Sequence, residues 1–288
     1  MDKDDILREF DFHSILENNG EERVEIKSPI VEIKKQAYPI LEYDQQKQSI
    51  TQVKKDIYPK SLPIKRCVIT YFQDVVVKLE TSYKMFQAFK LRIEGKRPEV
   101  YQLDTGTESI YVLLCPLGAP QAARMLEILS ALGVEKFMVC GGAGTLDDQI
   151  TGERILVPVA AVRDEGTSYH YLPPAREVAI NEKVRQTIVE CLRAEQENFA
   201  EVKTWTTDAS FRETPDKVEL RRSEGCAVVE MECAAYYAVA QFKGLACGQL
   251  LYAGDVVRRE GWDYREWHNR NDVREHLFNL AVKCVLKL

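Results

Sequence analysis

The feature that most constrains the fold is a regular alternation of short apolar runs with amphipathic segments from Cys67 to the C-terminus. The apolar runs are rich in aliphatic and β-branched residues and predict strands at 67–70, 74–79, 110–114, 136–140, 155–162, 228–229 and 246–252. The segments between them predict helices at 121–132, 181–196, 232–242 and 272–286, the second with Asn181 as its N-cap. This alternation predicts an α/β fold, with a central, largely parallel or mixed twisted sheet flanked by helices.

The first 64 residues have a different character from the rest. They are rich in Lys, Glu, Gln and Asp, and prolines at 29, 39, 59 and 63 interrupt their short apolar patches. We interpret 1–64 as an N-terminal extension that wraps the main domain or contacts a partner subunit. The remaining residues, 65–288, are enough for one domain with a sizeable core, since 45% of the chain is hydrophobic.

Composition excludes several classes of function. A formal net charge of −6 and a pI of about 5.5 argue against a nucleic-acid partner. No stretch approaches the roughly 18 apolar residues of a membrane helix, and the polar start MDKDDILREF is unlike a signal peptide. We therefore expect a cytoplasmic protein with no membrane partner. The eight cysteines are scattered without a CxxC pair or His at metal spacing, so we expect small buried hydrophobes and no metal site.

Glycines follow one of the buried strands in the stretch from Cys140 to Thr145. Gly141, Gly142 and Gly144 would let backbone N–H groups approach a ligand closely. The spacing matches neither a dinucleotide fingerprint nor a Walker A loop. A plain tight turn explains the stretch equally well.

Two carboxylates flank a methionine where a strand is predicted to become a helix. Glu230 and Glu232 can accept hydrogen bonds from two vicinal hydroxyls, and Met231 offers an apolar surface to a sugar face. The alternative is a solvated first helical turn, where acidic residues also suit the helix dipole.

Further candidates lie just after other strands. Asp255 follows a buried strand and Gly254, so partial burial would raise its pKa and suit it to donate a proton; the alternative is an N-cap. The stretch 205–214 offers aromatic faces and an Arg that could hold a flat ring, and the stretch 163–171 is similar in character. Both stretches are equally compatible with surface loops.

Taken in order, these motifs resemble the nucleoside phosphorylase superfamily, the purine and uridine phosphorylases with their nucleosidase relatives. Val-Glu-Met-Glu-Cys-Ala-Ala at 229–235 is similar to the Glu-Met-Glu-Ala-Ala ribose site of that family, and 118–120 looks like its Gly-x-Pro turn. The stretches 163–171 and 206–214 are similar to those of uridine-type members. Asp255 matches the acid of purine-cleaving members, and Arg270 falls where those enzymes carry an assisting Arg.

The resemblance implies a catalytic domain at 65–288 that acts on a nucleoside without a cofactor. Glu232 would anchor the ribose hydroxyls beside Glu230, and Met231 would pack on the sugar. Asp255, assisted by Arg270, would protonate the leaving base. Ser210, Phe211 and Arg212 would hold that base, and the glycines at 141, 142 and 144 would lie near C1′ and phosphate. The family also implies a homo-oligomer, a dimer or a hexamer, and a place in nucleoside catabolism and salvage.

The departures from the family concern its phosphate site. The Gly-Asp-Pro-x-Arg loop of phosphorylases reads Tyr-Phe-Gln-Asp-Val at 71–75, a second phosphate Arg corresponds to Val139, and the Ser or Thr corresponds to Gly142. Each lost charge-assisted bond is worth about 1.5–3 kcal/mol, so phosphate affinity at this place should fall by orders of magnitude. The family's N-terminal His, borrowed across a subunit interface, is not evident at 37–41.

Three functions therefore remain open at the level of sequence. The first expectation is phosphorolysis to free base and ribose 1-phosphate, with inorganic phosphate as co-substrate. The second is hydrolysis, in which Asp74, near the position of a catalytic Glu in nucleosidases, would activate water. The third is a non-catalytic nucleoside-binding protein. Asp255 suits a purine, whose N7 accepts a proton, so we expect purine or broad specificity.

Overall fold

The computed structural model describes residues 33–58, 63–82, 84–93, 97–147, 150, 154–265 and 270–288. Residues 33–45 and 53–288 form one compact unit, described below, and Gln46–Gln52 fall outside it. The predicted extension at 1–64 stays a prediction, because residues 1–32 lie outside the described part of the chain.

Four parallel strands form the centre of the sheet. In spatial order they are β10 (Ala246–Arg258), β5 (Lys136–Thr145), β1 (Arg66–Thr70) and β4 (Ser109–Leu114). Antiparallel pairing adds β3 (Glu99–Asp104) and then β2 (Met85–Lys90) beyond β4. The inner strands are buried at almost every position, as continuous apolar runs predict for a sheet covered on both faces.

A second group of strands runs in the opposite direction and closes part of the sheet into a ring. It consists of β6 (Ile155–Asp164), β8 (Phe199–Thr207) and β9 (Cys226–Glu230), which pair in parallel. β6 pairs antiparallel with β10, and β9 pairs antiparallel with β5. Two three-residue strands, β7 (Glu177–Ala179) and β11 (Gly261–Asp263), pair with β6 and β10. The predicted α/β class with a mixed twisted sheet is confirmed.

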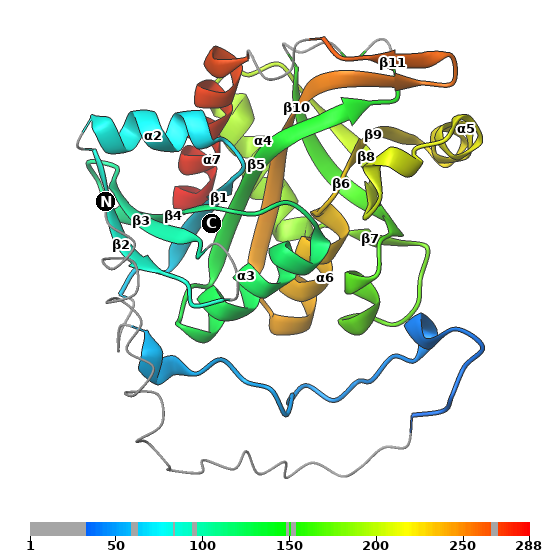
Figure 1. Cartoon of the computed structure of the whole chain (residues 1–288). Helices are drawn as coiled ribbons and strands as arrows, with labels where there is room; N and C mark the ends of the chain where they lie inside the picture. Colours follow the sequence, from blue (N-terminus) through cyan, green and yellow to red (C-terminus); the bar gives the residue numbers. More distant parts are fainter. Residues whose placement is uncertain are drawn as a thin grey trace, which may run out of the picture. The chain divides into compact units, whose positions relative to one another are not determined.

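Helices cover both faces of β5 and β10 (Figure 1). α3 (Ala119–Ala131) and α6 (Cys233–Lys243) pack together on one side. α4 (Glu182–Ala194) and α7 (Asn271–Lys287) pack on the other, and α2 (Gln73–Thr81) lies against α7. α5 (Pro215–Ser223) lies against β9 and β10. Four 3₁₀ turns complete the described elements: η1 (Pro39–Leu41), η2 (Lys55–Ile57), η3 (Thr167–His170) and η4 (Ser210–Arg212).

Several local predictions hold in detail. The Asn181 side chain accepts hydrogen bonds from the backbone N–H groups of Lys183 and Val184 at 3.0 and 3.4 Å, so it caps α4 as predicted. All eight cysteines are buried free thiols, which confirms their interpretation as small hydrophobes. Among the described residues no helix is long and apolar enough to cross a membrane.

The predicted strand at 74–79 is wrong, because these residues belong to helix α2. Val75 and Val76 are buried, whereas Asp74 and Lys78 are not. This pattern is the face of a helix and not the alternation of a strand. The run of valines favours a strand by propensity alone, and packing of α2 against α7 overrides that preference.

Two further expectations about strand ends are wrong. Gly141, Gly142 and Gly144 belong to β5 itself, which continues to Thr145, and not to a tight turn after it. Asp255 lies inside β10, which continues to Arg258, and not at a helix N-cap. Both candidate motifs are therefore held on adjacent, hydrogen-bonded strands, which is a more rigid setting than a loop.

Candidate active site

The site begins with a hydrogen bond between distant parts of the chain. The backbone N–H of Gly118, in the loop between β4 and α3, donates to Glu232 Oε1 at 2.6 Å. Gly118 has φ +102°, a backbone conformation that favours glycine. Glu232 precedes α6 directly, and its residue is only 5% exposed. The backbone N–H of Gly118 thereby fixes the Glu232 side chain near the ends of β4 and β9.

Glu230 is held entirely by protein groups. Its Oε2 accepts the backbone N–H groups of Glu232 and Cys233 at 2.8 and 2.6 Å, and its Oε1 accepts the Thr206 hydroxyl at 2.5 Å. The Thr204 hydroxyl donates more weakly at 3.4 Å. These bonds satisfy the first N–H groups of α6. Glu230 therefore positions Glu232 by building the start of α6, while Met231 lies half-buried between them.

Burial gives both carboxyl groups unusual proton affinity. Desolvation raises the pKa of Glu230. Desolvation, and then the neighbouring charge of Glu230, raise the pKa of Glu232 to about 8. The raised pKa therefore favours the protonated form of Glu232.

The three glycines of β5 allow close contact with neighbouring side chains. A Cβ atom on Gly142 would lie 3.2 Å from the Tyr252 ring, and one on Gly144 would lie 3.2 Å from Asp255 Oδ1 and 3.1 Å from Val229. Gly141 likewise faces the Tyr71 ring at 3.3 Å. These glycines have no positive φ, so the backbone conformation does not require glycine here. The close neighbouring side chains do, because they leave little room for a Cβ atom.

The second acid of the site lies across β5 from the first. Asp255 on β10 contacts Gly144, which pairs with Val229 just before Glu230. Asp255 Oδ2 accepts the indole N–H of Trp262 from β11 at 2.5 Å. Glu213, which follows η4, is half-buried; burial and then the charge of Asp255 raise its pKa to about 7. Sequence patterns did not single out Trp262 or Glu213.

A third cluster lies beside Gly142. Arg274, from α7, donates from Nε to the Tyr252 hydroxyl at 3.2 Å and from a terminal nitrogen to Asp74 Oδ1 at 3.4 Å. Its guanidinium lies 5.8 Å from the centre of the Phe72 ring. Arg270, the Arg expected from the resemblance, precedes α7 one turn before Arg274. In the described part of the chain, Arg270 makes no hydrogen bond or ion pair with Asp255.

The predicted base-binding residues are the least enclosed part of the site. Ser210, Phe211 and Arg212 form η4, and all three are exposed, Phe211 completely. In the stretch 163–171, the Arg163 side chain stabilises the segment that follows it, since it donates to the Ser168 hydroxyl and to two backbone carbonyls. The structure thus brings Glu232, Gly144 and Asp255 to one edge of the sheet and leaves η4 at the surface beside Glu213.

Residues 65–285 match the family model described as the phosphorylase superfamily. The chain belongs to the phosphorylase superfamily. The resemblance drawn from the motifs is thereby confirmed. Members of this superfamily with which the chain compares are nucleoside phosphorylases and nucleosidases, which are enzymes. Among the described residues, no group of three or more His, Cys, Asp or Glu side chains could hold a metal ion.

Curated superfamily relatives include a guanosine phosphorylase and several uridine phosphorylases. The guanosine phosphorylase of Halorubrum lacusprofundi is 30% identical over 137 residues, which are 46% of this chain and 56% of the relative. The uridine phosphorylase of Escherichia coli is 22% identical over 234 residues, which are 76% of this chain and 87% of the relative.

Solved structures of the superfamily share the fold. Futalosine hydrolase of Helicobacter pylori aligns with a TM-score of 0.64 at 17% identity and covers 78% of this chain and 98% of its own. Uridine phosphorylase of Vibrio fischeri aligns with a TM-score of 0.65 at 20% identity and covers 80% and 93%. Hydrolases and phosphorylases therefore match this fold about equally, and the nucleophile has to be inferred from the site.

Proposed function

We propose that this protein cleaves the N-glycosidic bond of a nucleoside with water as the nucleophile. The observation that carries this proposal is the cluster of Asp74, Arg274 and Tyr252 beside Gly142. It occupies the place where the resemblance puts the phosphate ligands of the family. Sequence alone gives phosphorolysis as the first expectation, and the composition of this cluster favours hydrolysis.

The charges around this place favour water over a phosphate dianion as the nucleophile. A phosphate dianion needs several cationic or N–H ligands, and valines stand at 75 and 139 where the family carries arginines. Arg274 is close to the place, but its charge faces the carboxylate of Asp74. A Cβ atom on Gly142 would lie 3.2 Å from the Tyr252 ring, so a hydroxyl-bearing side chain there would have to displace this ring. An uncharged nucleophile fits such a place better than a dianion.

The remaining roles follow the chemistry of an oxocarbenium-like transition state. Glu232 would bind the ribose hydroxyls, and Asp255 would give a proton to the leaving base. Asp74, half-buried on the first turn of α2 and oriented by Arg274, would take a proton from the attacking water. The reaction needs no cofactor, because each step uses only water, the nucleoside and these side chains.

Base release decides between the nucleophiles. Adenosine, inosine, guanosine, uridine and methylthioadenosine would be incubated with the protein with and without phosphate, and base, ribose and ribose 1-phosphate separated by chromatography. We expect equal release in both buffers, with free ribose as the sugar product. Release only with phosphate would overturn hydrolysis, and no release of any base would favour a binding protein.

The role of Asp74 has its own test. D74N should reduce base release about 100-fold, the size typical of a lost general base. The matched control is D216N, because Asp216 is exposed on α5 and makes one ion pair at 3.5 Å with Arg259. Unchanged turnover in D74N would exclude Asp74 as the group that activates water.

Phosphorolysis is the second candidate, and Arg274 is the observation that favours it. The curated relatives named above are phosphorylases, and a phosphate could compete with Asp74 for the Arg274 guanidinium. If base release requires phosphate and R274M loses this phosphate-dependent release, phosphorolysis with a rebuilt anion site replaces hydrolysis as the function.

A further inference from the structure

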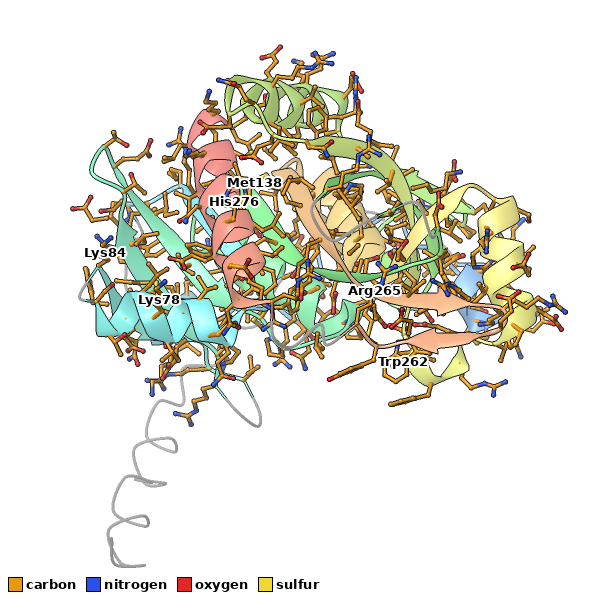
Figure 2. The ribbon with its side chains drawn as sticks, turned by 90° about the horizontal axis from the view of Figure 1, so that it is seen from above. Lys78, Lys84, Met138, Trp262, Arg265 and His276 are labelled. Atoms are coloured by element: carbon orange, nitrogen blue, oxygen red, sulfur yellow. The ribbon has the colours of Figure 1, made fainter. Side chains whose placement is uncertain are left out.

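Among the described residues, the hydrogen-bond partner of the Asp255 side chain is an indole and not a guanidinium. Trp262 Nε1 lies 2.5 Å from Asp255 Oδ2. Both residues belong to one hairpin, in which β10 and β11 pair with Val257 opposite Trp262. Figure 2 labels Trp262 on this hairpin, seen from above. The contact is therefore local and does not depend on the start of α7.

The two oxygens of Asp255 have different surroundings. Oδ2 faces the indole N–H, and Oδ1 faces Gly144, where a Cβ atom would lie only 3.2 Å away. Gly144 pairs with Val229, the residue before Glu230, so Oδ1 lies beside the end of the strand that leads to the ribose-binding carboxylates. The charge of Asp255 also acts on Glu213, which is acidic as well.

An indole nitrogen has a property that a carboxylate or imidazole partner lacks: it donates a hydrogen bond and cannot accept one. Trp262 can keep its bond to Oδ2 whether Asp255 is ionised or protonated, and this bond favours Oδ2 as the unprotonated oxygen because an oxygen that carries a proton is the weaker acceptor. A proton bound by Asp255 is thereby favoured on Oδ1, beside Gly144.

We propose that Trp262 is a positioning residue that fixes the acidic proton of Asp255 on Oδ1, facing the base that leaves during glycosidic cleavage. This inference rests on the proposed function and adds a residue to it. As the C1′–N bond breaks, its electron pair goes to the base, which takes the proton from Oδ1. Water adds its oxygen to C1′ and releases one proton, so the overall reaction consumes one water and no acid.

The exposed ring adds a second reason to assign a role to Trp262. The residue is 63% exposed, and its ring meets Tyr264 edge to face at 5.3 Å. A tryptophan kept for the core would be buried, as Trp205 is. On this hairpin the indole is held by its polar atom, which is the arrangement expected of a group that orients Asp255.

The first experiment compares leaving groups. W262F keeps an aromatic ring next to Tyr264 and removes the N–H donor. Turnover of purine nucleosides, which need protonation of the base, should fall about 10- to 100-fold with little change in KM. Turnover of p-nitrophenyl β-riboside, whose leaving group needs no proton, should stay within about twofold of the wild type.

Equal losses on both substrates would overturn the proposal, because they would indicate a role in binding or folding. The same applies if R270M shows the leaving-group pattern and W262F does not, since Arg270 would then assist the acid. If the unmodified protein cleaves neither substrate, the proposed function fails, and the contact itself is tested as follows.

The second experiment needs no activity. In ¹⁵N-labelled protein, the Trp262 indole resonance is identified by its loss in W262F. A charge-assisted bond to a carboxylate moves this resonance, so D255A should shift it strongly, and D216N should leave it in place. If D255A does not shift the indole resonance, the bond between Trp262 and Asp255 is absent in solution. This result would overturn the inference independently of turnover.

Discussion

The Gly118 N–H and the Glu232 carboxylate meet at 2.6 Å although 114 residues separate them in the chain. Backbone N–H groups of Gly118 and Met231 favour the ionised form of Glu232, yet burial and the Glu230 charge oppose it more strongly and raise its pKa to about 8. The raised pKa therefore favours a proton on Glu232, and ribose hydroxyls, as donors, would help to remove it.

Glu232→Gln should stabilise the empty protein as pH rises. A carboxyl with its folded pKa raised above the unfolded value contributes stability below the unfolded pKa of about 4.5, and that stability is lost as pH rises through about 8. Gln removes this dependence, so the variant should gain on the order of 2–4 kcal/mol relative to the wild type between pH 5 and pH 9. Urea unfolding at both pH values measures it.

The control for this prediction is Glu108→Gln, whose parent carboxylate is exposed and paired with Arg66. Its stability relative to the wild type should barely change over the same range. A Glu232→Gln variant with the same pH profile as the wild type would show that Glu232 is ionised throughout.

Nucleoside binding should release protons near neutral pH. Hydroxyl donors stabilise the carboxylate of Glu232, so its pKa should fall in the complex and affinity should increase from pH 6 to pH 9. Isothermal titration calorimetry in two buffers of different ionisation enthalpy measures the released protons. Glu232→Ala should abolish this release and weaken binding far more than it lowers stability; an equal loss of both would indicate a structural role.

Gly118→Ala should reduce activity through the backbone. A Cβ atom would meet nothing closer than Pro120 Cδ at 3.9 Å, so space is available, but φ +102° is unfavourable for alanine by about 1–3 kcal/mol. Relaxing this strain turns the N–H away from Glu232. Gly106→Ala is the matched control, since Gly106 has φ +85° in the β3–β4 turn. Both variants should lose stability, and only Gly118→Ala should also raise the KM for nucleosides.

The sequence carries enough information for the central strands and for the acidic residues of the site, but β2, β3 and β8 are strands that it did not predict. Continuous apolar runs identify β1, β4 and β5, and the pattern around Glu232 identifies the start of α6. These predictions succeed because burial on both faces leaves a strong local signal. The strand predicted at 74–79 fails because valines favour strands and only contact with α7 decides for a helix.

What the sequence does not reveal are the partners of those acidic residues. Arg274 contacts Asp74 across 200 residues, and no local spacing encodes that approach. Trp262 is closer to Asp255 in the sequence, because Arg259 and Glu260 alone form the turn that joins β10 to β11. Its bond to Asp255 follows from that hairpin, whereas Arg270 was favoured on the strength of the resemblance alone.

Gly142→Ala should show whether the Tyr252 ring fills the family's phosphate place. A Cβ atom would lie 3.2–3.3 Å from two ring atoms and the hydroxyl oxygen of Tyr252, so this side chain must move and strain its bond to Arg274. The variant should lose about 1–3 kcal/mol of the free energy of unfolding. In a Tyr252→Leu background the same substitution should cost at least about 1 kcal/mol less, because the smaller side chain leaves room. Urea unfolding of the four proteins gives this coupling. Additive losses would mean that the ring already yields freely, and that a serine or phosphate could enter beside Gly142 without displacing anything.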